Sequence, residues 1–322
     1  MKKDKAFRLH NHMRIIRTNI EHRMHYSQFI QNERNGIFDI DCFSEKYYAP
    51  RIEWAPHNNY YGAEKVLREY AGINKRLNAF MEHGLQAYEM VEKEDIETYG
   101  CKKVVTFSNM RKAAIQHVFQ DKYEICVVGP YISYAKSFYT EEEKVKLKEK
   151  YGRILTFFPA HTIYGMDPDK YDPEFEFVSE KLEQYKKKLN IDSIFVCGYW
   201  RDIWVDRLKK YKNAGYTIVS AGHAMSPLFL SRLKSIFEIS DYAISDAFGT
   251  QIGYSLACNT PHCILTKNGV HSNQSNGIWF INETKAFDSF DKNGSKEQQE
   301  VLNYLWGLDQ IKSPEELKKI LL

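Results

Sequence analysis

The sequence predicts an α/β protein of two domains, the second of which is a parallel sheet with helices on both faces. Three observations support this prediction. The chain has 322 residues, more than a single hydrophobic core usually supports. Hydrophobic residues make up 43% of it and aromatic residues 14%, which is enough for a sizeable core. Short β-branched or aromatic runs alternate with helical patterns throughout the second half.

The second half contains five apolar runs that are typical of buried strands. They cover 153–160, 193–200, 216–222, 241–245 and 262–267. The helical patterns between them cover 174–190, 202–215, 227–240 and 249–259, and Ser226 stands where it can cap the third of these helices. Because the strands are apolar nearly throughout, we expect both faces of the sheet to be covered. Right-handed crossovers then give a parallel, doubly wound sheet.

The first half indicates a smaller set of strands and helices that can form a second α/β domain. Runs typical of strands occur at 78–84, 102–108 and 123–129, and helical patterns at 62–77 and 109–120. A charged helical run at 140–152 indicates a solvated helix, and the domain boundary is predicted near it. The predicted domains are therefore 1–145 and 146–322. Two closing helices follow, with Ser295 and Ser313 as their capping residues.

Composition and charge exclude several classes of protein. The net charge of +3, with 27% charged residues, is too balanced for a dedicated nucleic-acid binder, although it suits anionic ligands. The six cysteines contain no CxxC pair, so neither a disulfide framework nor a zinc framework is predicted. The basic start lacks the apolar core of a signal peptide, and no apolar run approaches the ~20 residues that cross a bilayer. We expect a cytoplasmic protein, with peripheral contact at the inner face of the membrane left open.

Polar and aromatic residues end or directly follow four of the five strands predicted in the second half. In an open parallel sheet, ligands bind outside the carboxyl ends of the strands. In chain order, these residues are His161 and Thr162, Trp200, Gly222 and His223, and Ser245 and Asp246. A single histidine at such a place is usually structural. Four consecutive strand ends of this kind favour a binding site along one edge of the sheet.

Gly249 and Thr250 stand where the fourth of these strands passes into a helix. Glycine allows a ligand to approach the backbone, threonine adds a hydroxyl, and a helix N-terminus favours phosphate. The same two residues can equally form an ordinary turn and helix cap. The segment has neither the lysine of a Walker loop nor the GxGxxG pattern of a dinucleotide site. Any phosphate site here is therefore of another kind.

Candidate residues in the first half follow the strands predicted there. Glu82 and His83 lie at the end of the first strand-like run and are residue types that accept protons near neutral pH. Arg111 begins a helix and Tyr131 follows the third strand, which makes them candidates for the acceptor side of a site. His57 is a further candidate because of its polar and aromatic neighbours. Each of these residues can also belong to an ordinary loop or cap.

Two acidic pairs have the DxD spacing found in some metal sites. They are Asp39 with Asp41, and Asp167 with Asp169. Such short pairs often arise by chance, and Asp-Pro-Asp is ordinary turn composition. We therefore predict no obligatory metal. A serine hydrolase is disfavoured because the sequence has no GxSxG motif, and no cysteine has local support as a nucleophile.

The stretch 216–265 is similar to the donor-binding half of bacterial glycosyltransferases of the two-Rossmann (GT-B) class. In those proteins a late strand ending in Ser or Asp meets a Gly-Thr or Ser-Thr helix start, as in "SDAFGT" here, followed by "GY…P". The segments "TFFPAHTIYG" and "VVGPYISYA" also resemble stretches of proteins that build capsule and lipopolysaccharide. The resemblance covers roughly residues 78–265.

This resemblance implies two Rossmann-like domains with a cleft between them, and transfer of a sugar from a CMP- or UDP-linked donor to a surface glycan. It implies that Gly249 and Thr250 hold the donor phosphate, with His223 and Ser245 beside it and His161 at the cleft. His161 is followed by Thr162, whereas sialyltransferase-like and Kdo-transferase-like members have proline there. This departure leaves the donor open. Paired glutamates of retaining members are missing from the final helices, which favours inversion. The nucleotide sugar is a co-substrate, and no further cofactor is implied.

Several other functions fit the same sequence features. Polyol-phosphate transferases of the teichoic-acid type and sugar-nucleotide epimerases share this architecture. A non-catalytic protein that binds a sugar nucleotide during capsule assembly is a third alternative. An α/β protein with an unrelated small-molecule site is a fourth, because a fold does not imply a function.

Overall fold

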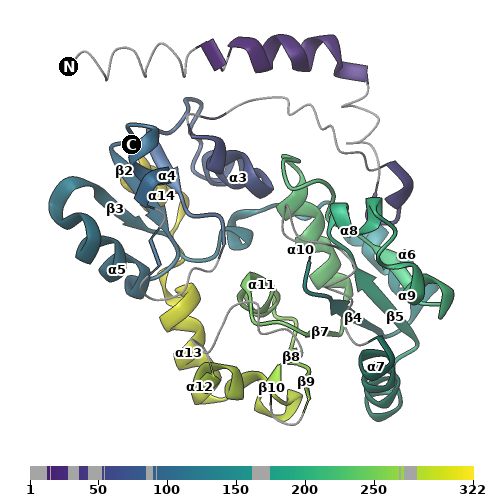
Figure 1. Cartoon of the computed structure of the whole chain (residues 1–322). Coiled ribbons are helices and arrows are strands. Elements are labelled where there is room, and N and C mark those ends of the chain that lie inside the picture. Colours follow the sequence, from purple (N-terminus) through teal and green to yellow (C-terminus); the bar gives the residue numbers. More distant parts are fainter. Residues whose placement is uncertain are drawn as a thin grey trace.

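The computed structural model describes residues 13–27 except 15, 36–42, 53, 55–84, 90–161 except 92, 175–271 except 268 and 269, and 281–322. Within these residues the chain forms two separate parallel sheets, each accompanied by helices (Figure 1). Residues 13–14 and 16–27 are largely helical and precede both sheets.

The larger sheet contains all five strands predicted in the second half. They are β4 (Ile154–Phe158), β5 (Ser193–Cys197), β6 (Thr217–Val219), β7 (Tyr242–Ser245) and β8 (His262–Ile264). All are parallel to their neighbours, in the order β6-β5-β4-β7-β8. The strand order therefore reverses between β4 and β7, which is the point where open α/β sheets bind their ligands.

Both faces of this sheet are buried, as predicted. On β4, Ile154 and Phe158 join one hydrophobic cluster, whereas Leu155 and Phe157 join another. The sheet is covered by α7 (Phe175–Leu189), α8 (Trp200–Trp204), α9 (Lys209–Asn213), α10 (Phe229–Ile239) and α11 (Thr250–Ala257). Alternate residues of one strand thus contribute to two cores, which explains why the strand sequences are apolar throughout.

Two of the predicted helices differ in detail. The helix predicted at 202–215 is two short helices, α8 and α9, because the chain turns between them at Asp206, whose φ is +57°. Ser226 does not cap α10, which begins at Phe229. Its hydroxyl instead accepts a hydrogen bond of 3.1 Å from the N–H of Leu228, in the turn before the helix.

The smaller sheet consists of the three strands predicted in the first half. β1 (Ala79–Met81), β2 (Lys103–Thr106) and β3 (Glu124–Val127) are parallel and adjacent in that order. Its helices are α3 (Ala63–Tyr70), α4 (Lys93–Thr98) and α5 (Asn109–Phe119). Helix α3 is shorter than the predicted 62–77 because the chain leaves it through Gly72, whose φ is +62°. The side chain of Ser108 caps α5.

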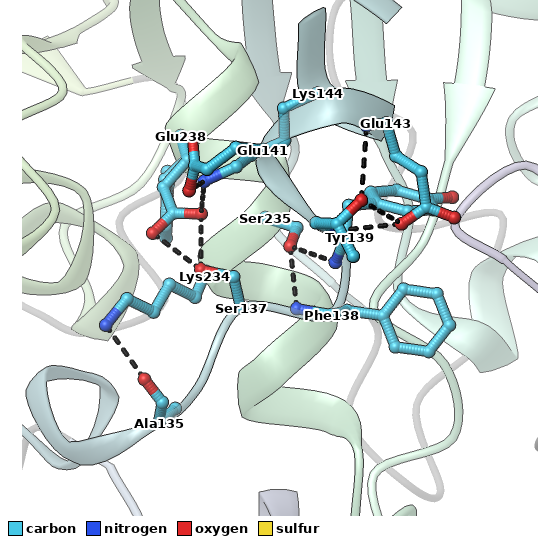
Figure 2. Close-up of polar contacts among 12 residues, drawn as sticks. Ala135, Ser137, Phe138, Tyr139, Glu141, Glu143, Lys144, Lys234, Ser235 and Glu238 are labelled. Atoms are coloured by element: carbon cyan, nitrogen blue, oxygen red, sulfur yellow. Dashed lines mark hydrogen bonds and ion pairs between the residues drawn. The ribbon is translucent and has the colours of Figure 1, made fainter. Parts of the chain in front are cut away.

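The segment that joins the two sheets is attached to α10 of the larger one (Figure 2). The Ser235 hydroxyl accepts hydrogen bonds from the N–H groups of Phe138 (2.8 Å) and Tyr139 (3.0 Å). Glu238 binds the hydroxyl of Ser137 and the ammonium of Lys144. Helix α6 (Glu141–Tyr151), which carries a capping box at Thr140, therefore packs against α10, beside the larger sheet. This attachment begins earlier in the chain than the predicted boundary at 145.

The last helix returns to the first sheet. Ser295 and Ser313 cap α13 (Lys296–Trp306) and α14 (Pro314–Leu321), as predicted. Helix α14 packs on α3, and the Lys103 ammonium donates a hydrogen bond of 2.9 Å to the carbonyl of Ile320. The end of the chain thus packs with the smaller sheet, which departs from the predicted division into 1–145 and 146–322. We call the smaller sheet with its helices the first unit, and the larger sheet with its helices the second unit.

The remaining elements are short. They are the hairpin of β9 (Thr266–Lys267) and β10 (Val270–His271), helix α12 (Ile281–Thr284), and the 3-10 helices η1 (Ile40–Cys42), η2 (Pro56–Gly62), η3 (Gln120–Lys122), η4 (Tyr131–Tyr134), η7 (Lys285–Phe287), η8 (Phe290–Lys292) and η9 (Leu308–Gln310).

Candidate functional site

A cavity of about 370 Å³ lies between the two units and is lined by residues from both. The first unit contributes Tyr61, His83 and Gly84. The second contributes residues that follow β4, β5 and β7, together with the start of α11. Cavities of this size hold small ligands in other proteins. The position at the carboxyl ends of the strands is the one that parallel sheets use for binding.

Four of the predicted site residues line this cavity: His83, His161, Gly249 and Thr250. They come from three separate parts of the chain. Gly84 lies opposite the helix start, since a Cβ atom on it would be 3.5 Å from the Thr250 hydroxyl. The two units therefore approach each other at the point where His83 and Thr250 face the same space.

The start of α11 lies on the cavity and has no side-chain cap. Gly249 is its N-cap residue, with φ of −171° and ψ of −170°, and no side chain caps the helix. The adjacent Gln251 side chain instead donates a hydrogen bond of 2.9 Å to the carbonyl of Ala247. The positive end of the helix dipole is thus directed at the cavity, which favours an anionic group there.

His83 is held by aromatic neighbours. Its ring centroid lies 4.8 Å from that of Tyr60, 5.4 Å from that of His57 and 6.4 Å from that of Tyr61. His161, on the other side of the cavity, is exposed, and its ring packs against Tyr199 at 4.6 Å. The two imidazoles are therefore placed from different units and differ in how firmly they are packed.

Three predicted residues of the first half lie in the protein interior instead. Glu82 and Arg111 form a buried ion pair, with Arg111 Nε 3.2 Å from Glu82 Oε2, and the Thr106 hydroxyl also donates to this carboxylate. Tyr131 is 1% exposed and its hydroxyl donates to the carbonyl of Val105. Neither the base predicted at Glu82 nor the acceptor contacts predicted at Arg111 and Tyr131 fit these positions, because all three side chains are used within the core.

Ser245 and Asp246 support the cavity without lining it. Both are fully buried. Asp246 Oδ1 accepts a hydrogen bond of 2.6 Å from the N–H of Ala160, which fastens the turn after β4 to the end of β7. The Ser245 hydroxyl donates to the carbonyl of Ala247 and lies 3.0 Å from His262 Nε2. The direct donor contacts expected of these two residues are therefore replaced by an indirect role in holding the cavity wall.

Trp200, Gly222 and His223 form a group beside the cavity rather than part of its lining. The Trp200 ring lies 4.2 Å from that of His223. His223 Nδ1 accepts a hydrogen bond of 3.1 Å from the N–H of Met225, and burial lowers the pKa of this histidine to about 4. The imidazole of His223 is thus neutral, and its Nδ1 is already hydrogen-bonded within the fold. Thr162, predicted to bind the donor, lies outside the described residues.

Sequence reasoning missed Tyr61, which joins the two units. Its φ is +61°, rare for a residue with a side chain, and its N–H donates a hydrogen bond of 2.6 Å to the carbonyl of Ala224. Its ring contacts Phe229 at 4.6 Å. No local signal marks this residue, because its conformation depends on the second unit. Tyr199 and Gln251, also in the lining, belong to the polar and aromatic groups that the sequence places at the same strand ends.

The predicted acidic pairs do not mark a metal site in the part of the chain that the structure describes. Asp39 is exposed and accepts a hydrogen bond of 2.7 Å from the N–H of Gly36. Asp167 and Asp169 lie outside the described residues. Among the described side chains, no group of three or more His, Cys, Asp and Glu residues is close enough together to hold a metal ion. No helix within the same residues has the length and hydrophobicity needed to cross a bilayer.

Protonation of His262 is expected to destabilise the protein in acid. The ring is buried between the hydroxyls of Ser255 (2.8 Å) and Ser245 (3.0 Å), and burial lowers its pKa from 6.5 to about 3. Between these two pH values the unfolded chain binds a proton that the folded one does not. The free energy of unfolding should therefore fall as the pH falls from 6.5 toward 3, by about 1.4 kcal/mol per pH unit for this group.

Urea denaturation of a His262→Gln variant measured across this pH range checks the expectation. In the variant, the free energy of unfolding should depend less steeply on pH, by the contribution of about one proton. A His117→Gln variant, changed at an exposed position on α5, is the matched control. Equal slopes in the wild type and the His262→Gln variant would contradict the assignment.

The arrangement of the two sheets around the cavity defines the architecture of this protein. Two Rossmann-like α/β units facing a shared cavity at the carboxyl ends of their strands constitute the GT-B arrangement. No family model and no curated protein matches this sequence.

Several solved structures are similar to this chain over most of its length. One is a glycosyltransferase from Rickettsia africae, with 15% identity, a TM-score of 0.36, and coverage of 76% of this chain and 70% of that one. Another is the UDP-GlcNAc 2-epimerase of Methanocaldococcus jannaschii, with 11% identity, a TM-score of 0.42, and coverage of 79% and 72%. A variant of the wall teichoic acid polymerase TagF has 12% identity and a TM-score of 0.39, and the match covers 70% of this chain and 57% of TagF. Similarities of this extent assign neither a reaction nor a substrate.

Proposed function

We propose that this protein is a glycosyltransferase that takes its sugar from a nucleotide-activated donor. The observation that carries the proposal is the position of His83 of the first unit and the start of α11 of the second on one cavity. Transfer of a sugar needs a group that accepts the proton of the acceptor hydroxyl and a group that stabilises the leaving phosphate. The two units supply one of these groups each.

The leaving phosphate would lie at the start of α11. Negative charge develops on it as the bond to the sugar breaks, and preorganised backbone dipoles stabilise such charge at little reorganisation cost. The Thr250 hydroxyl adds a hydrogen-bond donor, and His161 adds an imidazole on the same cavity. These groups need no metal ion for this task, so we propose that transfer is metal-independent and expect EDTA to leave it unchanged.

The acceptor hydroxyl would approach from the first unit. Within the lining contributed by that unit, His83 is the side chain suited to accept a proton near neutral pH. Attack from the face opposite the leaving phosphate would invert the anomeric centre. We propose a CMP- or UDP-linked donor, a bacterial surface glycan as acceptor, and action in the cytoplasm as the finer form of this function.

A thermal-shift screen against CMP, UDP, GDP and CDP tests the binding part. A ligand that binds the folded state alone should raise the Tm by several degrees, since saturation at a hundredfold excess over Kd is worth about 2.7 kcal/mol. The shift should shrink in a Thr250→Val variant. A Thr98→Val variant, in which the lost hydroxyl lies on the exposed part of α4, is the matched control. If none of the four nucleotides changes the Tm, the proposal is wrong.

Product analysis with matching donor sugars then tests the reaction. A transferred sugar supports the proposal. A transferred phosphopolyol or an epimerised free sugar would instead identify one of the two alternative enzymes, which the same cavity can also accommodate. Binding without turnover would indicate a non-catalytic sugar-nucleotide-binding protein.

A further inference from the structure

The helical segment at residues 13–27 carries an exposed apolar stripe. Met13, Ile16, Ile20 and Met24 follow one another at spacings of three, four and four residues, which places them on one face of a helix. Their side chains are 56%, 41%, 53% and 74% exposed. A contiguous apolar stripe in contact with water marks an interaction surface.

On the opposite side of this segment, polar side chains turn toward the protein. His22 is buried, Thr18 is half-buried, and the Arg14 guanidinium donates a hydrogen bond of 3.3 Å to the carbonyl of Glu53. Figure 1 shows the segment in purple at the periphery of the molecule. A surface helix normally buries its apolar face and exposes its polar one. Here the arrangement is reversed, so the apolar face is available to something outside the chain.

The charge of this part of the chain indicates what kind of partner the apolar face binds. Residues 1–27 contain seven Lys and Arg residues and two acidic residues, a net charge of +5. The whole chain carries +3, so the remaining residues carry −2. At 3.6 residues per turn, Arg17 and Arg23 fall on the two margins of the apolar stripe, and both are exposed. Arg17 also pairs with Glu21 at 2.9 Å, on the same margin.

We propose that this face binds the surface of a bilayer that contains anionic lipids. The apolar stripe would enter the boundary between headgroups and acyl chains, and the flanking arginines would extend toward the lipid phosphates. Each basic residue near such a surface adds to the attraction. A second copy of the chain is a less suitable occupant, because it would bring a like-charged segment onto this one. This inference is independent of the reaction proposed for the cavity.

Vesicle co-sedimentation tests the proposal with the full chain. The probes are vesicles of phosphatidylcholine alone and of phosphatidylcholine mixed with phosphatidylglycerol. We expect binding to the mixed vesicles that weakens as salt is raised, and at least about tenfold weaker binding to the neutral ones. An Ile20→Glu/Met24→Glu variant should reduce binding to the mixed vesicles by at least about tenfold, and an Arg17→Gln/Arg23→Gln variant should bind less and respond less to salt.

A Val145→Glu variant is the matched control. Val145 is 56% exposed on α6, so the substitution adds one negative charge, half of that added by the double variant, at an apolar surface position elsewhere. All variants should keep the Tm of the wild type, since the substituted side chains are exposed. Equal sedimentation of the wild type and the Ile20→Glu/Met24→Glu variant would overturn the proposal. So would self-association that this variant abolishes while neither protein binds vesicles, because the stripe would then be an interface between copies.

Discussion

An Arg111→Met variant is expected to lower the free energy of unfolding by about 3–5 kcal/mol, because it leaves a buried carboxylate without its cation. Arg111 is fully buried and the Glu82 side chain is 4% exposed, and two guanidinium nitrogens of Arg111 contact this carboxylate. Water cannot replace the lost partner at this depth. Urea denaturation at neutral pH measures the loss.

Removing both charges tests whether the lost stability comes from the unpaired carboxylate of Glu82. A Glu82→Gln/Arg111→Met variant keeps an acceptor for the Thr106 hydroxyl and should recover much of the stability that Arg111→Met loses. Lys296 and Glu300 form an exposed ion pair at 3.5 Å, and a Lys296→Met variant should change the stability by less than about 0.5 kcal/mol. A loss as small as this in the Arg111→Met variant would show that the buried pair is not required.

A His83→Ala variant is expected to lose about 10²- to 10⁴-fold of the transfer rate, the usual contribution of a general base. His83 lines the cavity from the first unit, whereas the proposed phosphate site belongs to the second. Nucleotide binding should therefore persist in the variant, with the same Tm shift as in the wild type. Initial rates with the donor identified by the thermal-shift screen measure the effect on turnover.

His117 supplies the matched control for this substitution. It lies exposed on α5 of the same unit, and a His117→Ala variant should retain full activity. Full activity in the His83→Ala variant would exclude His83 as the base. A loss of nucleotide binding together with turnover would instead place His83 at the donor, and the acceptor side would need another base.

The predicted site residues that proved to line the cavity share one property. His83, His161, Gly249 and Thr250 lie in the short segments that lead out of strands, and the carboxyl ends of parallel strands meet at one edge whatever the details of packing. The residues that proved to be interior, such as Glu82 and Arg111, also follow strands or begin helices. They differ because their side chains meet each other across 29 residues of sequence. Local patterns contain no information about such a pairing.

The sequence by itself determined the strands, the parallel sheets and most of the helix ends, because apolar periodicity and capping residues act within a few positions of the chain. Tertiary structure alone decided which polar side chains reach the cavity. It also decided that α14 returns to the first unit and that Tyr61 adopts its left-handed conformation against Ala224. The reversed orientation of the N-terminal segment belongs with these. The physical reason is common to them: burial and pairing depend on contacts between distant parts of the chain, which only the folded arrangement brings together.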